Sequence, residues 1–127
     1  MKDEFVVTPY GVSGEIDYDT LVERFGTKRI DEPLLKRLSK YGPLHHMLRR
    51  EVFYSHRDLD WVLNEYDKGN KFALYTGRGP SGPIHLGHLM PWTFTKYLQD
   101  VFKVNLWFQL TDDEKFMFYD HLTLEET

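Results

Sequence analysis

Residues 72–88 read Phe-Ala-Leu-Tyr-Thr-Gly-Arg-Gly-Pro-Ser-Gly-Pro-Ile-His-Leu-Gly-His, and this stretch decides the fold. It opens on a short apolar and aromatic run, residues 72–76, which indicates a strand. Residues 77–83 follow with three glycines and two prolines, so we expect a loop of unusual backbone geometry there. A strand that leads through a glycine-rich loop into a helix is the beginning of an α/β unit.

The segment after this loop completes the unit. Apolar residues at helical spacing predict a helix from about residue 86 to residue 102, with Pro91 tolerated near its start. A second apolar run, residues 104–110, predicts the next strand. Neither run alternates, so we expect parallel strands covered on both faces, with Trp92 and Trp107 in the core. The predicted fold class is α/β, with a Rossmann-like parallel sheet.

The first 70 residues predict a helical and hairpin extension that precedes the sheet. Turn-forming residues separate short apolar groups in the first 15 residues, which favours a hairpin or an extended arm. Three helices follow, bounded by capping residues and glycines. The expected boundaries are a stop at Gly26, a start at Asp31, a stop at Gly42, a start at Ser55 with Asp58, and a stop at Gly69.

Composition bounds the class of protein. The chain has 127 residues, 41% of them hydrophobic, which suits one folded domain with a real core. A net charge of −4 gives no global positive field, so any contact with RNA must come from a local patch. Without cysteine there are no disulfides or thiolate metal sites. No apolar run approaches the ~20 residues of a membrane helix, and no signal peptide is visible, so we expect a soluble, cytoplasmic protein and no membrane partner.

The turn at residues 85–88, His-Leu-Gly-His, carries the first chemical signal. A glycine-rich turn that opens a helix is an anion site, because free N–H groups and the helix dipole face the ligand. Two histidines add donors, and Arg78 adds a delocalised cation suited to phosphate. The pattern is neither a Walker loop nor G-x-G-x-x-G. His85 and His88 could also be two zinc ligands, but no third or fourth ligand is evident, and we expect no metal held by the protein.

The second signal is residues 109–115, Gln-Leu-Thr-Asp-Asp-Glu-Lys, at the end of the next strand. Such ends border the ligand crevice in open α/β sheets. Gln109 interrupts an apolar strand, so its amide needs a buried partner. Thr111 and Glu114 have the spacing of a capping box, and taken alone that structural role is the better interpretation.

Together these motifs resemble a known family. Gly-Arg-Gly-Pro-Ser before His-x-Gly-His, followed by Thr-Asp-Asp-Glu-Lys after a strand that carries glutamine, is similar to tryptophanyl-tRNA synthetase of the archaeal and eukaryotic cytoplasmic type. The histidine signature is that of class I aminoacyl-tRNA synthetases. Residues 48–50 and 55–58 also resemble the family, so the resemblance runs from about residue 17 onward. It implies that residues 71–127 are the first half of a catalytic domain behind the extension of residues 1–70.

The resemblance also implies roles for individual residues. On the amino-acid side, Tyr75 and Gln109 would bind the indole N–H of tryptophan, with Gly77 beside them, and Glu114 would hold the α-ammonium group. Catalysis would fall to His85, His88 and Lys115. The nucleotide site would consist of Arg78, Gly79, His85, Gly87, His88 and Lys115.

The implied reaction is ATP- and Mg²⁺-dependent activation of L-tryptophan and its transfer to tRNA(Trp), by an enzyme that is a homodimer. The chain ends before the Lys-Met-Ser-Lys-Ser-type loop and the anticodon-binding domain of such enzymes, so we expect a fragment. Two alternatives stay open: the sister synthetase for tyrosine, and a non-catalytic, synthetase-derived binding module.

Overall fold

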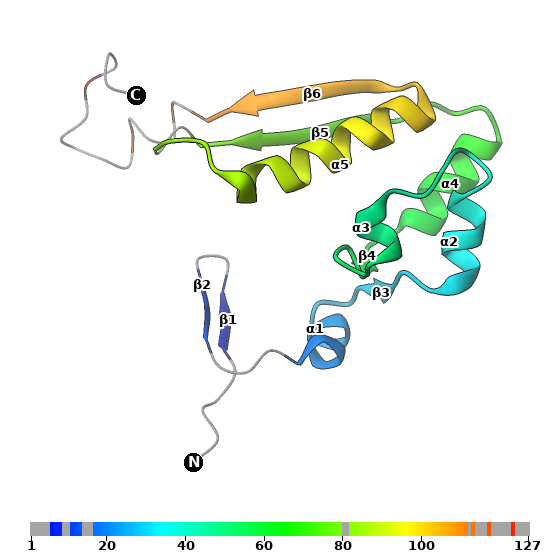
Figure 1. Cartoon of the computed structure of the whole chain (residues 1–127), viewed down its shortest axis with the longest axis horizontal. Helices are drawn as coiled ribbons and strands as arrows, with labels where there is room; N and C mark the ends of the chain where they lie inside the picture. Colours follow the sequence, from blue (N-terminus) through cyan, green and yellow to red (C-terminus); the bar gives the residue numbers. More distant parts are fainter. Residues whose placement is uncertain are drawn as a thin grey trace.

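The computed structural model describes residues 6–8, 11–13, 17–79, 82–111, 113, 117 and 123. The chain contains both helices and strands (Figure 1). Their order is β1 (Val6–Thr8), β2 (Gly11–Ser13), α1 (Tyr18–Arg24), β3 (Lys28–Arg29), α2 (Glu32–Leu38), α3 (His46–Arg49), β4 (Ser55–His56), α4 (Leu59–Asp67), β5 (Ala73–Arg78), α5 (Leu86–Phe102) and β6 (Asn105–Leu110).

Strands β5 and β6 form a parallel pair joined by α5, which confirms the predicted α/β unit. Tyr75 lies opposite Trp107, and Gly77 lies opposite Gln109. The long helix α5 runs beside the pair (Figure 1), and its bounds match the predicted range of residues 86–102. The loop prediction is wrong at its start, because Gly77 and Arg78 still belong to β5 and pair with β6.

One face of this sheet is covered by α5 and the other is open. Leu74 and Leu106 are half-buried, whereas Tyr75 and Trp107, which point the other way, are 70% and 66% exposed. The expectation of strands covered on both faces is therefore wrong here, as is the placing of Trp107 in the core. The physical reason is that only one helical layer packs on the pair within the described residues. The open face carries Tyr75, Gly77 and Gln109.

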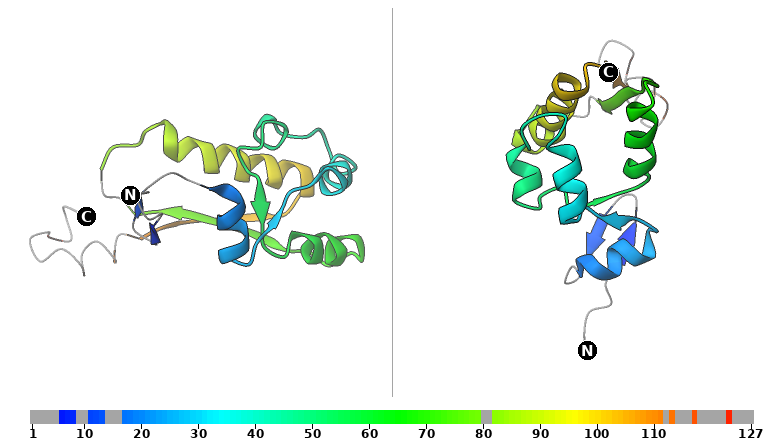
Figure 2. Two further views of the ribbon diagram at one scale, coloured as in Figure 1. Left: turned by 90° about the horizontal axis from the view of Figure 1, so that it is seen from below. Right: turned by 90° about the vertical axis from the view of Figure 1, so that its right-hand side faces the viewer.

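The hydrophobic core lies at the end of the sheet where the strands begin. Leu63 of α4 is completely buried. It packs with buried residues of α2 and α3, with Phe102 at the end of α5 and with Val104, which directly precedes β6. Figure 2 shows α2, α3 and α4 gathered at that end while the strands and the first turns of α5 extend beyond them. The Tyr66 hydroxyl donates to the Phe102 carbonyl at 2.9 Å and links α4 to α5. The helical cluster thus packs on the strands at one end, and among the described residues none of α2, α3 and α4 covers the other end.

Several helix boundaries differ from the sequence prediction for identifiable reasons. Asp31 caps α2 as expected, accepting from the Leu34 N–H at 3.0 Å, but the helix ends at Leu38, before Gly42. Gly42 instead lies against Val101, whose Cγ2 would be 3.1 Å from a Cβ there. Ser55 does not cap α4, because it pairs with β3 in strand β4.

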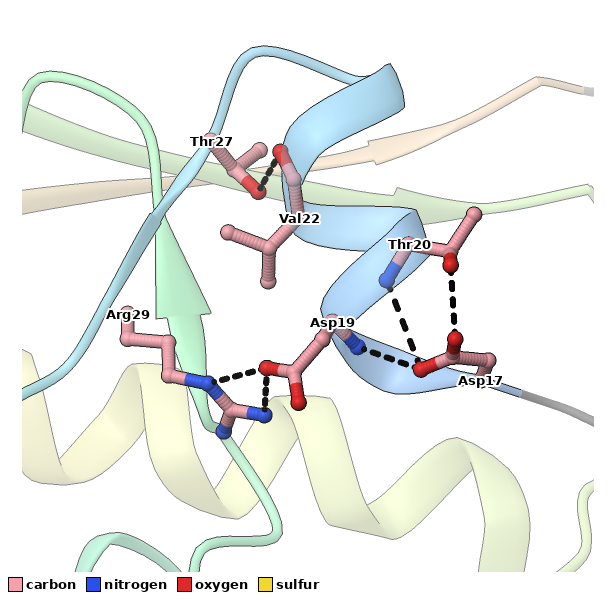
Figure 3. Close-up of polar contacts among 6 residues, drawn as sticks. All are labelled: Asp17, Asp19, Thr20, Val22, Thr27 and Arg29. Atoms are coloured by element: carbon pink, nitrogen blue, oxygen red, sulfur yellow. Dashed lines mark hydrogen bonds and ion pairs between the residues drawn. The ribbon is translucent and has the colours of Figure 1, made fainter.

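The N-terminal extension contains the expected hairpin, with β1 antiparallel to β2. Helix α1 is fixed by local polar contacts (Figure 3). Asp17 caps it by accepting from the Asp19 N–H at 3.0 Å, and Arg29 pairs with Asp19 at 2.5 Å. Gly26 ends the turn after the helix with a φ of +60°, as predicted. Within the described part of the chain, no helix is both long enough and apolar enough to cross a bilayer.

Candidate active site

The carboxyl ends of β5 and β6 meet the N-terminus of α5 at one edge of the sheet (Figure 1). Ligands of open α/β sheets bind at this kind of edge. The predicted residues of both signals gather there: Tyr75, Gly77 and Arg78 on β5, Gln109 on β6, and the two histidines at the start of α5. The structure therefore places the histidine turn and the Tyr75–Gln109 pair toward the same end of the sheet, while their roles as a site stay a prediction.

The two histidines cap α5 reciprocally. His85 is the N-cap residue, and its Nδ1 accepts from the Gly87 N–H at 3.2 Å. The Nδ1 of His88 accepts from the His85 N–H, also at 3.2 Å. A ring nitrogen that accepts a hydrogen bond carries no hydrogen, so each neutral ring has its hydrogen on Nε2. Both histidines thus offer an Nε2–H donor beside a helix N-terminus.

Gly87 allows this cap to form. A Cβ at position 87 would lie 3.0 Å from Cε1 and 3.1 Å from Nδ1 of the His85 ring. Any larger residue would press against the ring that caps the helix. The glycine therefore keeps the first turn of α5 compact around the capping ring, and the N–H groups of His85 and Gly87 are satisfied by the two histidine side chains.

The environment of His88 favours the neutral imidazole. Burial lowers the pKa of His88 below its usual value, and the neighbouring His85 and Arg78 lower it further. The two histidine rings lie 3.8 Å apart between centroids, at 37° to one another. At neutral pH the ring is thus an uncharged donor that also serves as a helix cap.

Arg78 closes the turn between β5 and α5. Its Nη2 donates to the carbonyl oxygens of Gly82 and of Pro83, the latter at 3.2 Å. Its Nε is buried and has no hydrogen-bond partner among the described residues. The guanidinium group is therefore used at least partly to hold the shape of the turn, a role that the sequence does not reveal.

The other half of the site is a contact between the two strands. The Tyr75 hydroxyl donates to Oε1 of Gln109. Gln109 therefore has a hydrogen-bond partner, as its position in an apolar strand predicts, but the prediction that this partner is buried is wrong, because Tyr75 is exposed. Gly77 lies between them, directly opposite Gln109. Because Gly77 has no side chain, nothing at this position obstructs the direct contact between the tyrosine and glutamine side chains.

Two predicted site residues, Glu114 and Lys115, lie outside the described residues, so the predicted capping box from Thr111 to Glu114 does as well. Gly79 is described and directly follows β5. Among the residues that the structure places, no three histidine, aspartate or glutamate side chains converge to hold a metal ion.

Comparison with known proteins gives the family. No family model matches the chain. A tryptophan–tRNA ligase from Saccharolobus solfataricus is 55% identical over all of this chain, and one from Pyrococcus furiosus is 52% identical over all of it. The chain belongs to the tryptophanyl-tRNA synthetase family. It spans about a third of the length of these relatives, 34% in both cases.

Solved tryptophanyl-tRNA synthetases share the fold as well. The enzyme from Trypanosoma brucei superposes with a TM-score of 0.81 and 51% identity, over 86% of this chain and 34% of its own. The enzyme from Plasmodium falciparum gives a TM-score of 0.83 and 48% identity, over 87% of this chain and 32% of its own. The described part of the chain therefore has the fold of a segment of a class I tryptophanyl-tRNA synthetase.

Proposed function

We propose that this protein activates L-tryptophan with ATP and transfers it to tRNA(Trp). One observation carries the proposal: the hydrogen-bonded Tyr75–Gln109 pair and the histidine-capped start of α5 both lie toward the carboxyl end of the β5–β6 pair, on its two faces. An amino-acid site and an anion site at the same end of the sheet would suit the joining of an amino acid to a nucleotide.

The Tyr75–Gln109 pair suits the indole ring of tryptophan. Indole has a single polar group, an N–H donor, and needs an acceptor. The Gln109 Oε1 and the Tyr75 oxygen both keep lone pairs after the hydroxyl donates to the amide. A site built around such a donor discriminates strongly against side chains that lack it. By family likeness, Glu114 would bind the α-ammonium group.

The histidine turn suits the phosphates of ATP. The Nε2–H groups of His85 and His88 are donors at the positively polarised N-terminus of α5. Gly79 and Gly87 let the backbone approach the nucleotide, and Lys115 and Arg78 would add positive charge. Mg²⁺ would enter with the ATP phosphates, because magnesium in such sites binds mainly to phosphate oxygens and water.

The chemistry then needs positioning and charge stabilisation. A carboxylate oxygen of tryptophan attacks the α-phosphorus, the bond to the bridging oxygen breaks, and pyrophosphate leaves. No covalent enzyme intermediate is required. Neutral donors held at the α-phosphate stabilise the charge that builds up in the transition state. The second step passes the tryptophanyl group to the terminal ribose of the tRNA. We further propose that the intact protein acts as a cytoplasmic homodimer, as the family likeness implies.

Amino-acid-dependent ATP–pyrophosphate exchange tests the proposal in the intact protein. Exchange with tryptophan and none with tyrosine is the expected result. Exchange with tyrosine would show that the pocket at Tyr75 and Gln109 has been misassigned. Binding of tryptophan and ATP without exchange with either amino acid would leave a non-catalytic binding module and overturn the enzymatic proposal.

A further inference from the structure

We propose that Trp92 is a positioning residue that holds the His88 imidazole in its capping orientation, with Nδ1 on the helix start and Nε2–H offered to the ligand. The functional part of this inference rests on the proposed function, because it assumes that His88 acts on a nucleotide. The structural part stands on ring contacts alone.

His88 and Trp92 are neighbours on one face of α5, four residues apart. Their rings are close to parallel, 24° apart, with centroids 5.9 Å from one another. This offset stacking is a favoured geometry for aromatic rings. The hydrogen bond at Nδ1 fixes one atom of His88, and a ring against its face restricts rotation about the remaining torsion.

Trp92 is itself held by the sheet. The edge of its indole ring meets Phe108 of β6 at 5.2 Å between centroids, with the planes 72° apart. Phe108 directly precedes Gln109, the glutamine of the amino-acid half. An aromatic series therefore connects the histidine turn to the strand end that carries the other half of the site. Trp92 is half-buried and contacts both His88 and Phe108.

The stacking also protects the protonation state that the cap requires. Among the described residues, the charged and titratable groups that act on His88 are Arg78 of β5 and His85 of the same turn. Trp92 adds cover from water on the helix side. If His88 were protonated, Nδ1 would carry a hydrogen and could no longer accept from the His85 N–H. Loss of the indole ring should therefore loosen the cap as well as the ring.

Two substitutions separate positioning from space filling. Trp92→Leu keeps an apolar side chain but removes the ring, whereas Trp92→Phe retains a smaller ring that can stack. Trp61→Leu is the matched control, because Trp61 is 64% exposed on α4, away from the site. The readouts are the NMR titration of the labelled His88 ring and the pH profile of tryptophan-dependent pyrophosphate exchange, both in the intact protein.

In the Trp92→Leu variant we expect the His88 titration to move up toward the usual histidine range. Its kcat for exchange should fall about tenfold to a hundredfold at neutral pH, with the KM for tryptophan changed by less than about twofold. Trp92→Phe should keep the His88 titration and the kcat close to those of the unsubstituted protein, and Trp61→Leu should alter neither. An unshifted His88 titration in the Trp92→Leu variant would overturn the proposal. So would a KM for tryptophan that rises by the same factor as kcat falls.

A readout on the unsubstituted protein guards against variants that fail to fold. Stacking predicts nuclear Overhauser contacts between the His88 and Trp92 rings, and their absence would contradict the inference. If the titration shifts as expected but no exchange occurs with any amino acid, the positioning of the ring stands and its catalytic role falls together with the proposed function.

Discussion

Gly77 of β5 and Gln109 of β6 approach so closely that a Cβ on Gly77 would lie 2.4 Å from the Gln109 carbonyl oxygen. The obstacle is backbone, which cannot move aside as a side chain can. The glycine therefore serves two purposes at once. It lets the strands pair at the edge of the site, and it does not obstruct the hydrogen bond between the Tyr75 and Gln109 side chains.

Replacing Gly77 with alanine should separate the strands at this point. Overpacking of this kind typically costs about 1–3 kcal/mol. We expect the free energy of unfolding, measured in urea, to fall by that amount and the affinity for tryptophan to fall with it. Gly42→Ala is the matched control, because the atoms nearest to its new methyl group belong to the Val101 side chain, the first at 3.1 Å, and not to backbone. Equal effects from the two substitutions would contradict this account of Gly77.

The Tyr75 hydroxyl should matter for ligand binding and little for stability. Tyr75 is 70% exposed, so Tyr75→Phe should change the free energy of unfolding by less than about 0.5 kcal/mol. Removal of the hydroxyl that orients Gln109 should weaken tryptophan binding about tenfold, the effect of one lost hydrogen bond. Isothermal titration calorimetry measures this, with Tyr18→Phe on α1 as an exposed control. Unchanged tryptophan affinity would remove Tyr75 from the pocket.

The sequence predicts the α/β unit well because its signals are local. The start of α5 is marked by the glycine-rich turn, and its end at Phe102 by the change from helical to strand spacing. Tertiary pairing is harder to foresee. Ser55 has the chemistry of a helix cap, but its backbone pairs with Arg29, 26 residues away in the chain (55 − 29), and that contact decides its structure. Likewise, the composition of residues 77–83 masks the fact that Gly77 and Arg78 pair as a strand.

The site shows the same division. The motif alone indicates that His85 and His88 lie at a helix start, but not that each caps it through Nδ1, because histidine is an unusual capping residue. The sequence does offer one signal for these caps: His88 follows His85 by three residues, which is the spacing of a capping box. The open sheet face could not be foreseen either, since unalternated strands indicate cover on both faces, and the layer over Tyr75 and Trp107 is absent from the described residues.

The scaffold should depend most on the core beneath the helices. Leu63 is fully buried in the cluster that joins α4 to the end of α5. Leu63→Ala should lower the free energy of unfolding by about 2–5 kcal/mol, because it removes buried methyl groups and leaves a cavity. Leu89→Ala, at a residue 43% exposed on α5, should cost less than about 1 kcal/mol. Urea denaturation compares the two, and similar losses would mean that the core lies elsewhere.

Stability should fall as the pH drops below neutral. Burial lowers the pKa of His45, with smaller effects of His46 and Arg49. In the unfolded chain, His45 binds a proton with the usual pKa of about 6.5. In the folded chain its pKa is lower, so at pH 6.5 the folded chain binds fewer protons than the unfolded chain. The stabilising contribution is therefore complete above pH 6.5 and is lost as the pH falls through the lowered pKa. His88 acts in the same direction.

Thermal unfolding between pH 8 and pH 5 measures this loss. The Nδ1 of His45 caps α3 by accepting from the Met47 N–H at 3.3 Å, so protonation also removes a cap. Asparagine can cap a helix without titrating, and His45→Asn should therefore flatten the profile. A melting temperature that rises from pH 7 to pH 5 would show the sign to be wrong.

We assign the histidine turn to the nucleotide and the Tyr75–Gln109 pair to the amino acid. His88→Ala in the intact protein tests this assignment most directly. The measurement compares the rate of tryptophan-dependent ATP–pyrophosphate exchange with the dissociation constant of tryptophan. Because His88 is placed on the nucleotide side, we predict that exchange slows about a hundredfold or more, while tryptophan affinity changes by less than about twofold. If the exchange rate falls and the dissociation constant of tryptophan rises by the same factor, the assignment of the histidine turn to the nucleotide and of the Tyr75–Gln109 pair to the amino acid is contradicted.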